Sequence, residues 1–321
     1  MRACWSPEPA VIGIVINSIA PDGRPMPRLI VIAVLTLLCS ACSRTELAYR
    51  NADSLLEYYA WKTVRTSAAQ RDHWQPVLQT TLRHHRQQEL PLVIAYLDLA
   101  GRIIRVPEGS VGAECLVDGA LLLYQRHARL AVDLAIPLLA ELDAVQVEHL
   151  ADYTTRRQKN AAKRYHDPDP QRREAARLER ITDRIERWTG KLNESQRKHI
   201  KDALEHIPDL SASWLAYRAQ QTNTLLAMLE TGAEAETLRA YLNDWWVHRD
   251  GTSNETRQRW RVARHEFAQL MNDLAMTLSD KQRRTLETRL ADLRKELATF
   301  LSRTSQPVKL RSVPACASSP A

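Results

Sequence analysis

Three histidines share a spacing that could present two ligands to a metal ion. Each follows a glutamine by three residues, and such residues lie on one face of a helix. The pairs are Gln70/His73, Gln146/His149 and Gln196/His199. They sit at three different predicted helix starts, so we interpret the spacing as a by-product of helix capping. None of the ten histidines has Asp or Glu three residues before it, which excludes the Glu-x-x-His pattern of di-iron bundles. The sequence therefore predicts no metal site and no cofactor.

The other candidate side chains for chemistry are few. His84 and His85 are adjacent, so they point about 100° apart on a helix and we interpret them as partly exposed surface residues. Glu114, near apolar Val111 and Leu116, is the one carboxylate that could act as the buried general acid of a cell-wall hydrolase. The alternative for Glu114 is an ordinary solvated glutamate. No GxSxG, GxxxxGK[ST], HExxH or paired CxxC motif is present. The sequence thus predicts no catalytic residue.

A short motif predicts where four helices begin. A capping residue stands three positions before a glutamine, and an apolar residue follows that glutamine by four. In this capping box the cap side chain accepts from a first-turn amide, and the glutamine reaches back to the N–H of the cap. The four pairs are Ser67/Gln70, Asp143/Gln146, Asn193/Gln196 and Ser279/Gln282. Thr231/Glu234 and Thr252/Glu255 look like further boxes. The glutamines have no fixed period, which argues against a regular solenoid.

Apolar stripes in steps of three and four residues follow these caps and predict the core faces of helices. We expect helices at residues 143–166, 171–189 and 194–206. The segments on either side of Leu278 should be antiparallel neighbours. Residues 106–119 look like an irregular loop. With only nine glycines in 321 residues, the composition suits helices. The sequence therefore predicts an all-α fold, a multi-helix antiparallel bundle whose elongation is left open.

Residues 26–42 (MPRLIVIAVLTLLCSAC) have the plan of an export signal that ends in a lipidation site. An arginine precedes a short apolar run, and small residues stand directly before Cys42. The site resembles the lipobox of bacterial lipoproteins, so we expect cleavage before Cys42 and lipid on its sulfur. Ser43, which is not acidic, indicates transfer to the outer membrane. Residues 1–41 would then be a signal peptide. Whether Met26 is the true start, with residues 1–25 as a mis-assigned start, is left open.

We expect residues 42–304 to form a helical domain, either whole or as two halves split near 167–170, with residues 305–321 as a disordered tail. Removing residues 1–41 leaves a net charge of about +6 on the mature part, which favours contact with anionic surfaces such as lipid headgroups or cell-wall polymers. The alternative, which the spread of the charges along every helix favours, is that they are solvated helix faces. No basic run interleaved with aromatics suggests nucleic acid.

Tyr58, Tyr59 and Trp61 could lie at a membrane interface or pack in the core. A Cys115–Cys316 disulfide is left open.

The segments CSRTELAYRN at residues 42–51 and HHRQQELP at residues 84–91, with the recurring cap-x-x-Gln-Arg helix starts, resemble an uncharacterised family of Gram-negative lipoproteins. That family is known only as a domain of unknown function. The resemblance covers about residues 42–303, although Tyr58, Tyr59 and Trp61 replace a bulkier Trp-rich stretch. It implies helical structure and membrane attachment, and it carries no activity, substrate or catalytic residue.

Two functional hypotheses follow. The first is a membrane-anchored, periplasm-facing lipoprotein, held by the lipid on Cys42, that acts as a non-enzymatic binding or scaffold module. Its partner would be an envelope protein or a cell-wall polymer. The alternative is a cell-wall-modifying hydrolase that uses carboxylates.

Overall fold

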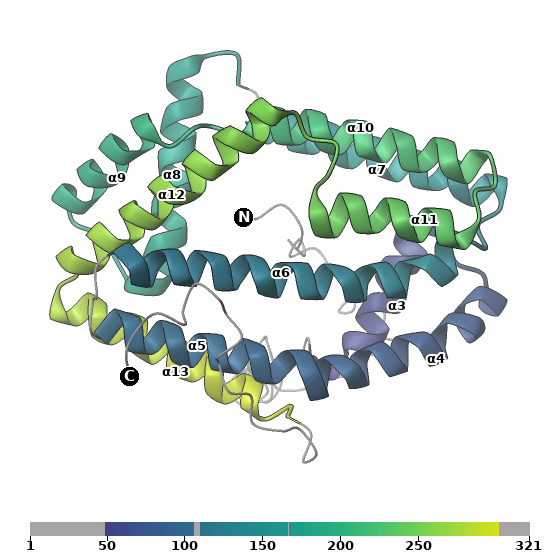
Figure 1. Cartoon of the computed structure of the whole chain (residues 1–321), viewed down its shortest axis with the longest axis horizontal. Coiled ribbons are helices and arrows are strands. Elements are labelled where there is room, and N and C mark those ends of the chain that lie inside the picture. The colour runs from purple at the N-terminus through teal and green to yellow at the C-terminus, as the bar shows by residue number, and fades with distance from the viewer. Residues whose placement is uncertain (1–48, 106–109, 166, 302–321) are drawn as a thin grey trace, which may run out of the picture. The chain divides into compact units, whose positions relative to one another are not determined.

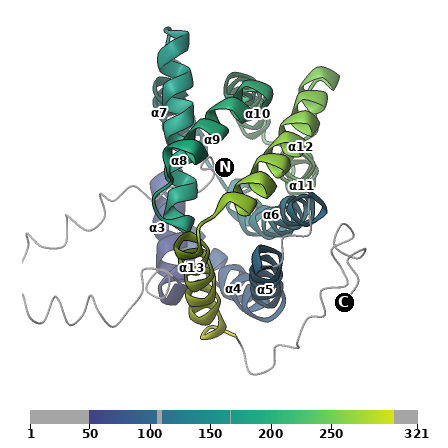
Figure 2. The same ribbon diagram turned by 90° about the vertical axis from the view of Figure 1, so that its left-hand side faces the viewer.

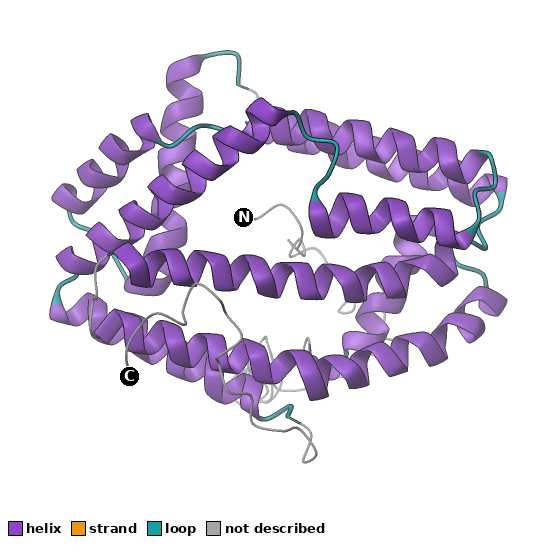
Figure 3. Ribbon diagram, viewed as in Figure 1, coloured by secondary structure: helices purple, strands orange, loops and turns teal. Residues whose placement is uncertain are grey.

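The computed structural model describes residues 49–105, 110–165 and 167–301. Within these ranges every regular element is a helix and there is no strand (Figure 3). The predicted all-α fold is confirmed. The predicted signal peptide, Cys42 and residues 305–321 lie outside the described ranges.

The helices follow one another along the chain with short connections (Figure 1). Two π-helical stretches, labelled η, interrupt this series: η2 joins α4 to α5, and η3 follows α11 directly. In a π-helix the backbone hydrogen bonds span one residue more than in an α-helix. The order is α3 (Ala52–Val64), α4 (Ala68–His84), η2 (His85–Glu89), α5 (Leu90–Arg105), α6 (Ser110–Leu139), α7 (Ala144–Tyr165), α8 (Pro170–Thr189), α9 (Glu194–His206), α10 (Ser211–Glu230), α11 (Ala235–Leu242), η3 (Asn243–His248), α12 (Asn254–Thr277) and α13 (Asp280–Ala298).

The loop predicted at residues 106–119 is wrong for residues 110–119, because α6 already begins at Ser110, while residues 106–109 lie outside the described ranges. Within this helical part, Gly112 has a packing role. A Cβ atom at Gly112 would lie 2.9 Å from Cγ2 of Ile103. The glycine therefore lets α6 approach α5 closely. The helices predicted at 143–166, 171–189 and 194–206 correspond to α7, α8 and α9.

The described helices form two modules with the same internal contacts. In module 1 (α3–α7), α3 contacts α4 and α7, and α4 contacts α6. In module 2 (α8–α13), α8 contacts α9 and α13, and α9 contacts α12. Thus α3, α4, α6 and α7 correspond to α8, α9, α12 and α13. Residues 167–170 lie between the last helix of module 1 and the first helix of module 2, and the division of the chain into separate halves there stays a prediction.

The two modules pack together reciprocally. Helix α5, inserted in module 1, packs against α13, the last helix of module 2. Helix α10, inserted in module 2, packs against α7, the last helix of module 1. The corresponding helices α6 and α12 contact each other. This pattern is the one expected of two copies related by an approximate two-fold axis.

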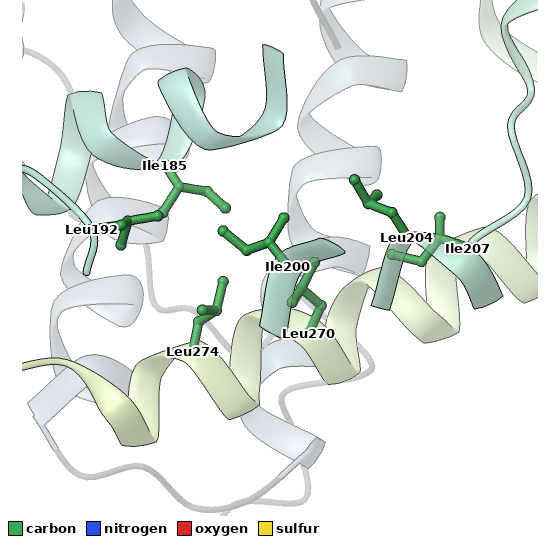
Figure 4. Close-up of a cluster of buried hydrophobic side chains, with 7 residues drawn as sticks. All are labelled: Ile185, Leu192, Ile200, Leu204, Ile207, Leu270 and Leu274. Atoms are coloured by element: carbon green, nitrogen blue, oxygen red, sulfur yellow. The ribbon is translucent and has the colours of Figure 1, made fainter. Parts of the chain in front are cut away.

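The apolar core is divided into several clusters, each of which joins a few helices. The cluster of module 2 draws its buried side chains from α8, from α9 and its flanking residues, and from α12 (Figure 4). Its members are Ile185, Leu192, Ile200, Leu204, Ile207, Leu270 and Leu274. Other clusters join α4 with α6, α6 with α10 and α11, and α5 with α13. Since a fully buried aliphatic side chain contributes about 1.5–3 kcal/mol, these clusters supply the main cohesion between helices.

The prediction that the segments flanking Leu278 are antiparallel neighbours is wrong. Helices α12 and α13 diverge from the turn between them (Figure 2). Helix α12 packs mainly on α6 and α9, whereas α13 packs on α5 and α8. Their apolar stripes are therefore buried against different partners, which the stripes alone do not reveal.

Candidate functional site

The eight capping residues predicted from the sequence hold four helix starts together in pairs. Each glutamine accepts, through Oε1, a hydrogen bond from the backbone N–H of its own cap, at 2.9–3.1 Å. Each cap side chain accepts in turn from the backbone N–H of that glutamine. These are the reciprocal bonds of a capping box.

The glutamine amides also bind one another. Gln70 and Gln146 exchange two amide hydrogen bonds of 2.9 and 2.8 Å. Gln196 and Gln282 exchange two of 3.1 and 2.9 Å. We call these the first and second Gln clasps. Each glutamine donates a further bond to the carbonyl two residues before its partner's cap, and these carbonyls are those of Glu141, Arg65, Thr277 and Lys191.

The other predicted box residues behave differently. Thr231 ends α10, and its hydroxyl donates to the carbonyls of Ala227 and Met228. The cap of α12 is Ser253, which accepts from the N–H of Thr256. The two additional boxes are therefore wrong.

The Gln-x-x-His histidines do not converge. His73 lies 3.2 Å from a carboxylate oxygen of Glu141, and His149 lies 3.2 Å from the carbonyl of Lys62. His199 lies 3.7 Å from Asp273 on α12, an acid partner that the sequence did not reveal. Among the residues that the structure describes, no group of three or more His, Cys, Asp or Glu side chains could hold a metal ion.

Glu114 lies on α6 and not in a loop. Its carboxylate is 2.9 Å from Nδ1 of His265 on α12, and the side chain is 46 % exposed. This setting is not the buried apolar cleft that a general acid of a glycosidase requires. Near it on α6, Cys115 takes part in a disulfide, while the Cys316 considered from the sequence lies outside the described ranges.

The site with the most unusual chemistry lies where α4 runs through η2 into α5, against α6. In η2 the N–H of Leu90 bonds to the carbonyl of His85, five residues earlier. Such π-helical turns shift the side-chain register and are frequent at functional sites. Here the turn is accompanied by a carboxylate, Glu89, of which only 2 % is exposed.

Glu89 forms a two-pronged ion pair with Arg126 of α6. Nε and Nη2 of Arg126 donate to the two carboxylate oxygens, both at 2.7 Å. Burial by itself would raise the pKa of Glu89, but the hydrogen bonds and charge of Arg126 more than offset burial and lower that pKa. Glu89 is therefore an ionised, fully paired carboxylate in the interior.

A pocket of about 460 Å³ opens beside this ion pair, and we call it the α4–α6 pocket. It is lined by Thr80, Thr81, His84, Glu89, Arg126, Arg129, Leu130 and Asp133. Asp133 accepts a hydrogen bond from Arg239 of α11, so both acids of the lining are paired with arginines. Arg129 is exposed.

Tyr49, His85 and His127 form a hydrogen-bonded chain, and the two histidines directly follow the pocket residues His84 and Arg126 in the sequence. Nδ1 of His127 is 2.6 Å from the carbonyl of Leu123, which can only accept, so this nitrogen carries a hydrogen. Nε2 of His127 lies 3.2 Å from Nε2 of His85, and Nδ1 of His85 lies 3.0 Å from the Tyr49 hydroxyl oxygen. Burial, followed by the neighbouring His127, lowers the pKa of His85 to about 4. His85 is thus a half-buried neutral residue, and not the surface histidine that we expected.

A second surface feature lies on α3. Tyr58 and Trp61 are 39 % and 40 % exposed, so they are not core residues. The ammonium of Lys62 lies 5.9 Å from the Tyr58 ring centre, and the guanidinium of Arg65 lies 4.3 Å from that of Trp61. We call these four residues the α3 surface.

Sequence reasoning missed Glu89, Arg126 and His127. The stretch HHRQQE reads as ordinary polar helix, and nothing in it marks the π-helical register that buries Glu89. A weak signal was available: an acid followed by Leu-Pro-Leu-Val-Ile stands at the edge of an apolar run.

The fold and site define a class: an all-helical protein of two similar modules with a charged pocket between α4 and α6. A comparison with family descriptions matches residues 62–245 to "Family of unknown function (DUF6279)". The chain belongs to that family. The matched range includes the first Gln clasp and all residues of the α4–α6 pocket. Curated proteins and solved structures yield no match. No described helix is long and apolar enough to cross a membrane.

Proposed function

We propose that the chain is a lipid-anchored helical binding module of the Gram-negative cell envelope. Lipid on Cys42 holds it at the outer membrane with the helical modules facing the periplasm. Its partner is an envelope protein or a cell-wall polymer. The export signal and lipobox pattern of residues 26–42 support the anchor.

The observation that carries this proposal is the α3 surface. Helix α3 begins at Ala52, ten residues after Cys42, so the lipid and this helix are close along the chain. Half-exposed Tyr and Trp side chains suit the boundary between headgroups and acyl chains. Each lysine or arginine near an anionic leaflet adds about 1 kcal/mol of attraction. The four residues of the α3 surface therefore fit a membrane that the lipid brings near.

The anchor is tested by metabolic labelling with palmitate in cells. We expect label on the wild-type chain and none on Cys42→Ala. Labelled Cys42→Ala protein would refute the assignment of the lipidation site.

The α3 surface is tested with Cys42→Ala protein and vesicles that contain a third of anionic lipid. Trp61→Ala should weaken co-sedimentation severalfold, because it removes the aromatic side chain on which Arg65 stacks. Trp188→Ala is the matched control, since Trp188 of α8 is 37 % exposed. Equal effects of the two substitutions would show that α3 is not the membrane-facing surface.

The partner is identified by in-cell crosslinking of the lipidated chain at native abundance, followed by mass spectrometry. One dominant envelope protein supports a scaffold role, and murein fragments support binding to the cell wall. Absence of any attached envelope component would contradict the binding role.

A further inference from the structure

We infer that the α4–α6 pocket is a binding site for an oxyanion, a carboxylate or phosphate group carried on a ligand of about the size of a sugar. This inference deepens the binding role proposed above by naming the chemistry of the ligand. It concerns a site that lies within the range matched by the family.

The first argument is the balance of charge in the lining. Both oxygens of Glu89 are occupied by Arg126, and Asp133 is bound by Arg239. Arg129 has no hydrogen-bond or ion-pair partner among the described residues. Nη1 of Arg126 likewise makes no bond within the described part of the chain. Two guanidinium groups therefore keep unused donors at a pocket whose acids are already paired.

The second argument is preorganisation. A guanidinium binds carboxylate or phosphate best when its plane is fixed, because two parallel N–H groups then meet two oxygens. The bond pair to Glu89 fixes the plane of Arg126 and leaves Nη1 as its free end. Since Glu89 is held in place by the π-helical turn and by burial, Arg126 is a rigid donor while exposed Arg129 is an adjustable one.

The third argument concerns size and the remaining lining. Small-ligand sites usually measure about 300–1,000 Å³, and this pocket measures about 460 Å³. The hydroxyls of Thr80 and Thr81 make no hydrogen bond with other described residues, so they are available to a ligand hydroxyl. Leu130 provides an apolar wall. An oxyanion on a small hydroxylated body matches this combination.

The fourth argument is that the pocket is not a by-product of the repeated architecture. Arg126 stands 17 residues before the cap of α7, Asp143, and Val262 stands 17 residues before the cap of α13, Ser279. Module 2 therefore has an apolar residue where module 1 has the arginine. Packing of the corresponding helices does not require a cation at this position.

The test is isothermal titration calorimetry on the full chain in non-ionic detergent at low ionic strength. The probes are inorganic phosphate, acetate and glucuronate, with glucose as the uncharged reference. We expect saturable 1:1 binding of at least one oxyanion and none of glucose. Binding of phosphate alone assigns a phosphate-bearing ligand, and binding of acetate and glucuronate assigns a carboxylate.

Arg129→Gln should weaken oxyanion binding at least tenfold. Because Arg129 is exposed, its replacement should leave the unfolding temperature unchanged. Arg102→Gln is the matched control, since Arg102 is an exposed arginine of α5 outside the pocket. Equal weakening by the two substitutions, unchanged binding in Arg129→Gln, or no saturable binding of any oxyanion would each overturn the inference. Cys42→Ala should bind the probes as the wild type does, so loss of the anchor and loss of the pocket are distinguishable.

Discussion

Replacing Gln196 by leucine tests how strongly the second Gln clasp holds module 2 together. The side chain is 2 % exposed and takes part in four hydrogen bonds. Its Oε1 accepts from the N–H of Asn193 and from Nε2 of Gln282, and its Nε2 donates to Oε1 of Gln282 and to the carbonyl of Thr277. Leucine has nearly the same volume, so Gln196→Leu removes these bonds without opening a large cavity.

The expected loss follows from the number of bonds. At about 1 kcal/mol for each buried hydrogen bond, Gln196→Leu should lower the free energy of unfolding by about 4 kcal/mol. Gln282→Leu should cost a similar amount. In the double variant, the loss in free energy of unfolding should be at least about 2 kcal/mol smaller than the sum of the two single losses. Both single variants lose the same two bonds between the amides, and in the double variant neither amide remains without its partner.

Urea unfolding followed by far-UV circular dichroism measures these differences as shifts in the midpoint at constant m-value. Gln70→Leu in the first clasp is the matched comparison. Gln70 is partly exposed, so water can replace some of its bonds, and the loss should be about half as large. A loss below about 1 kcal/mol for Gln196→Leu, or additive effects of the two single variants in the second clasp, would refute the reasoning.

Three further predictions concern other parts of the structure. Arg126→Leu removes both hydrogen bonds of the buried Glu89 carboxylate and leaves only His84, 3.6 Å away, beside it, so it should lower the free energy of unfolding by about 3–5 kcal/mol in urea titrations, and adding Glu89→Gln should recover much of the loss. The folded-state pKa of His85, about 4 against 6.5 when unfolded, means that the unfolded state binds more protons between those values. Stability should therefore fall by roughly 2 kcal/mol from pH 7 to pH 5, and a His85→Gln variant that falls equally would contradict this. Gly251→Ala should lower the melting temperature by several degrees, since Gly251 has φ of +79° and a Cβ would lie 2.9 Å from Nε2 of Gln221; an unchanged melting temperature would argue against strain there.

What the sequence predicted well is local. The cap and glutamine at Asn193 and Gln196 define the start of α9 at Glu194, because both hydrogen bonds of a capping box lie within one turn. In the helix predicted at 171–189, the apolar residues in steps of three and four include Ile185, which is buried in the structure. Such features depend on neighbours three or four residues away, which the sequence displays directly.

What it did not predict depends on distant partners. Gln70 meets Gln146 across 76 residues, and nothing near either residue identifies the other. The pocket combines the π-helical turn at His85–Glu89 with the ion pair of Glu89 and Arg126, which is 37 residues away in the sequence. The clasps and the pocket form only when the helices pack together. Local sequence patterns therefore do not predict them.

The two clasps explain why an irregular spacing in the sequence still reflects a repeated architecture. Paired glutamines are 76 residues apart in module 1 and 86 apart in module 2. Module 2 contains α11 and η3 between α10 and α12, whereas α6 is the next described helix after α5 in module 1. This insertion, offset in part because α12 has 24 residues and α6 has 30, is the reason that the spacing is longer in module 2. The same carbonyl, two residues before each cap, accepts the second amide hydrogen in all four cases. Such agreement in detail, together with the reciprocal packing of α5 and α10, argues that the modules are two copies of one design. Module 2 has Val262 at the position that Arg126 occupies in module 1. The arginine that lines the α4–α6 pocket is therefore specific to module 1 and is not part of the repeated design.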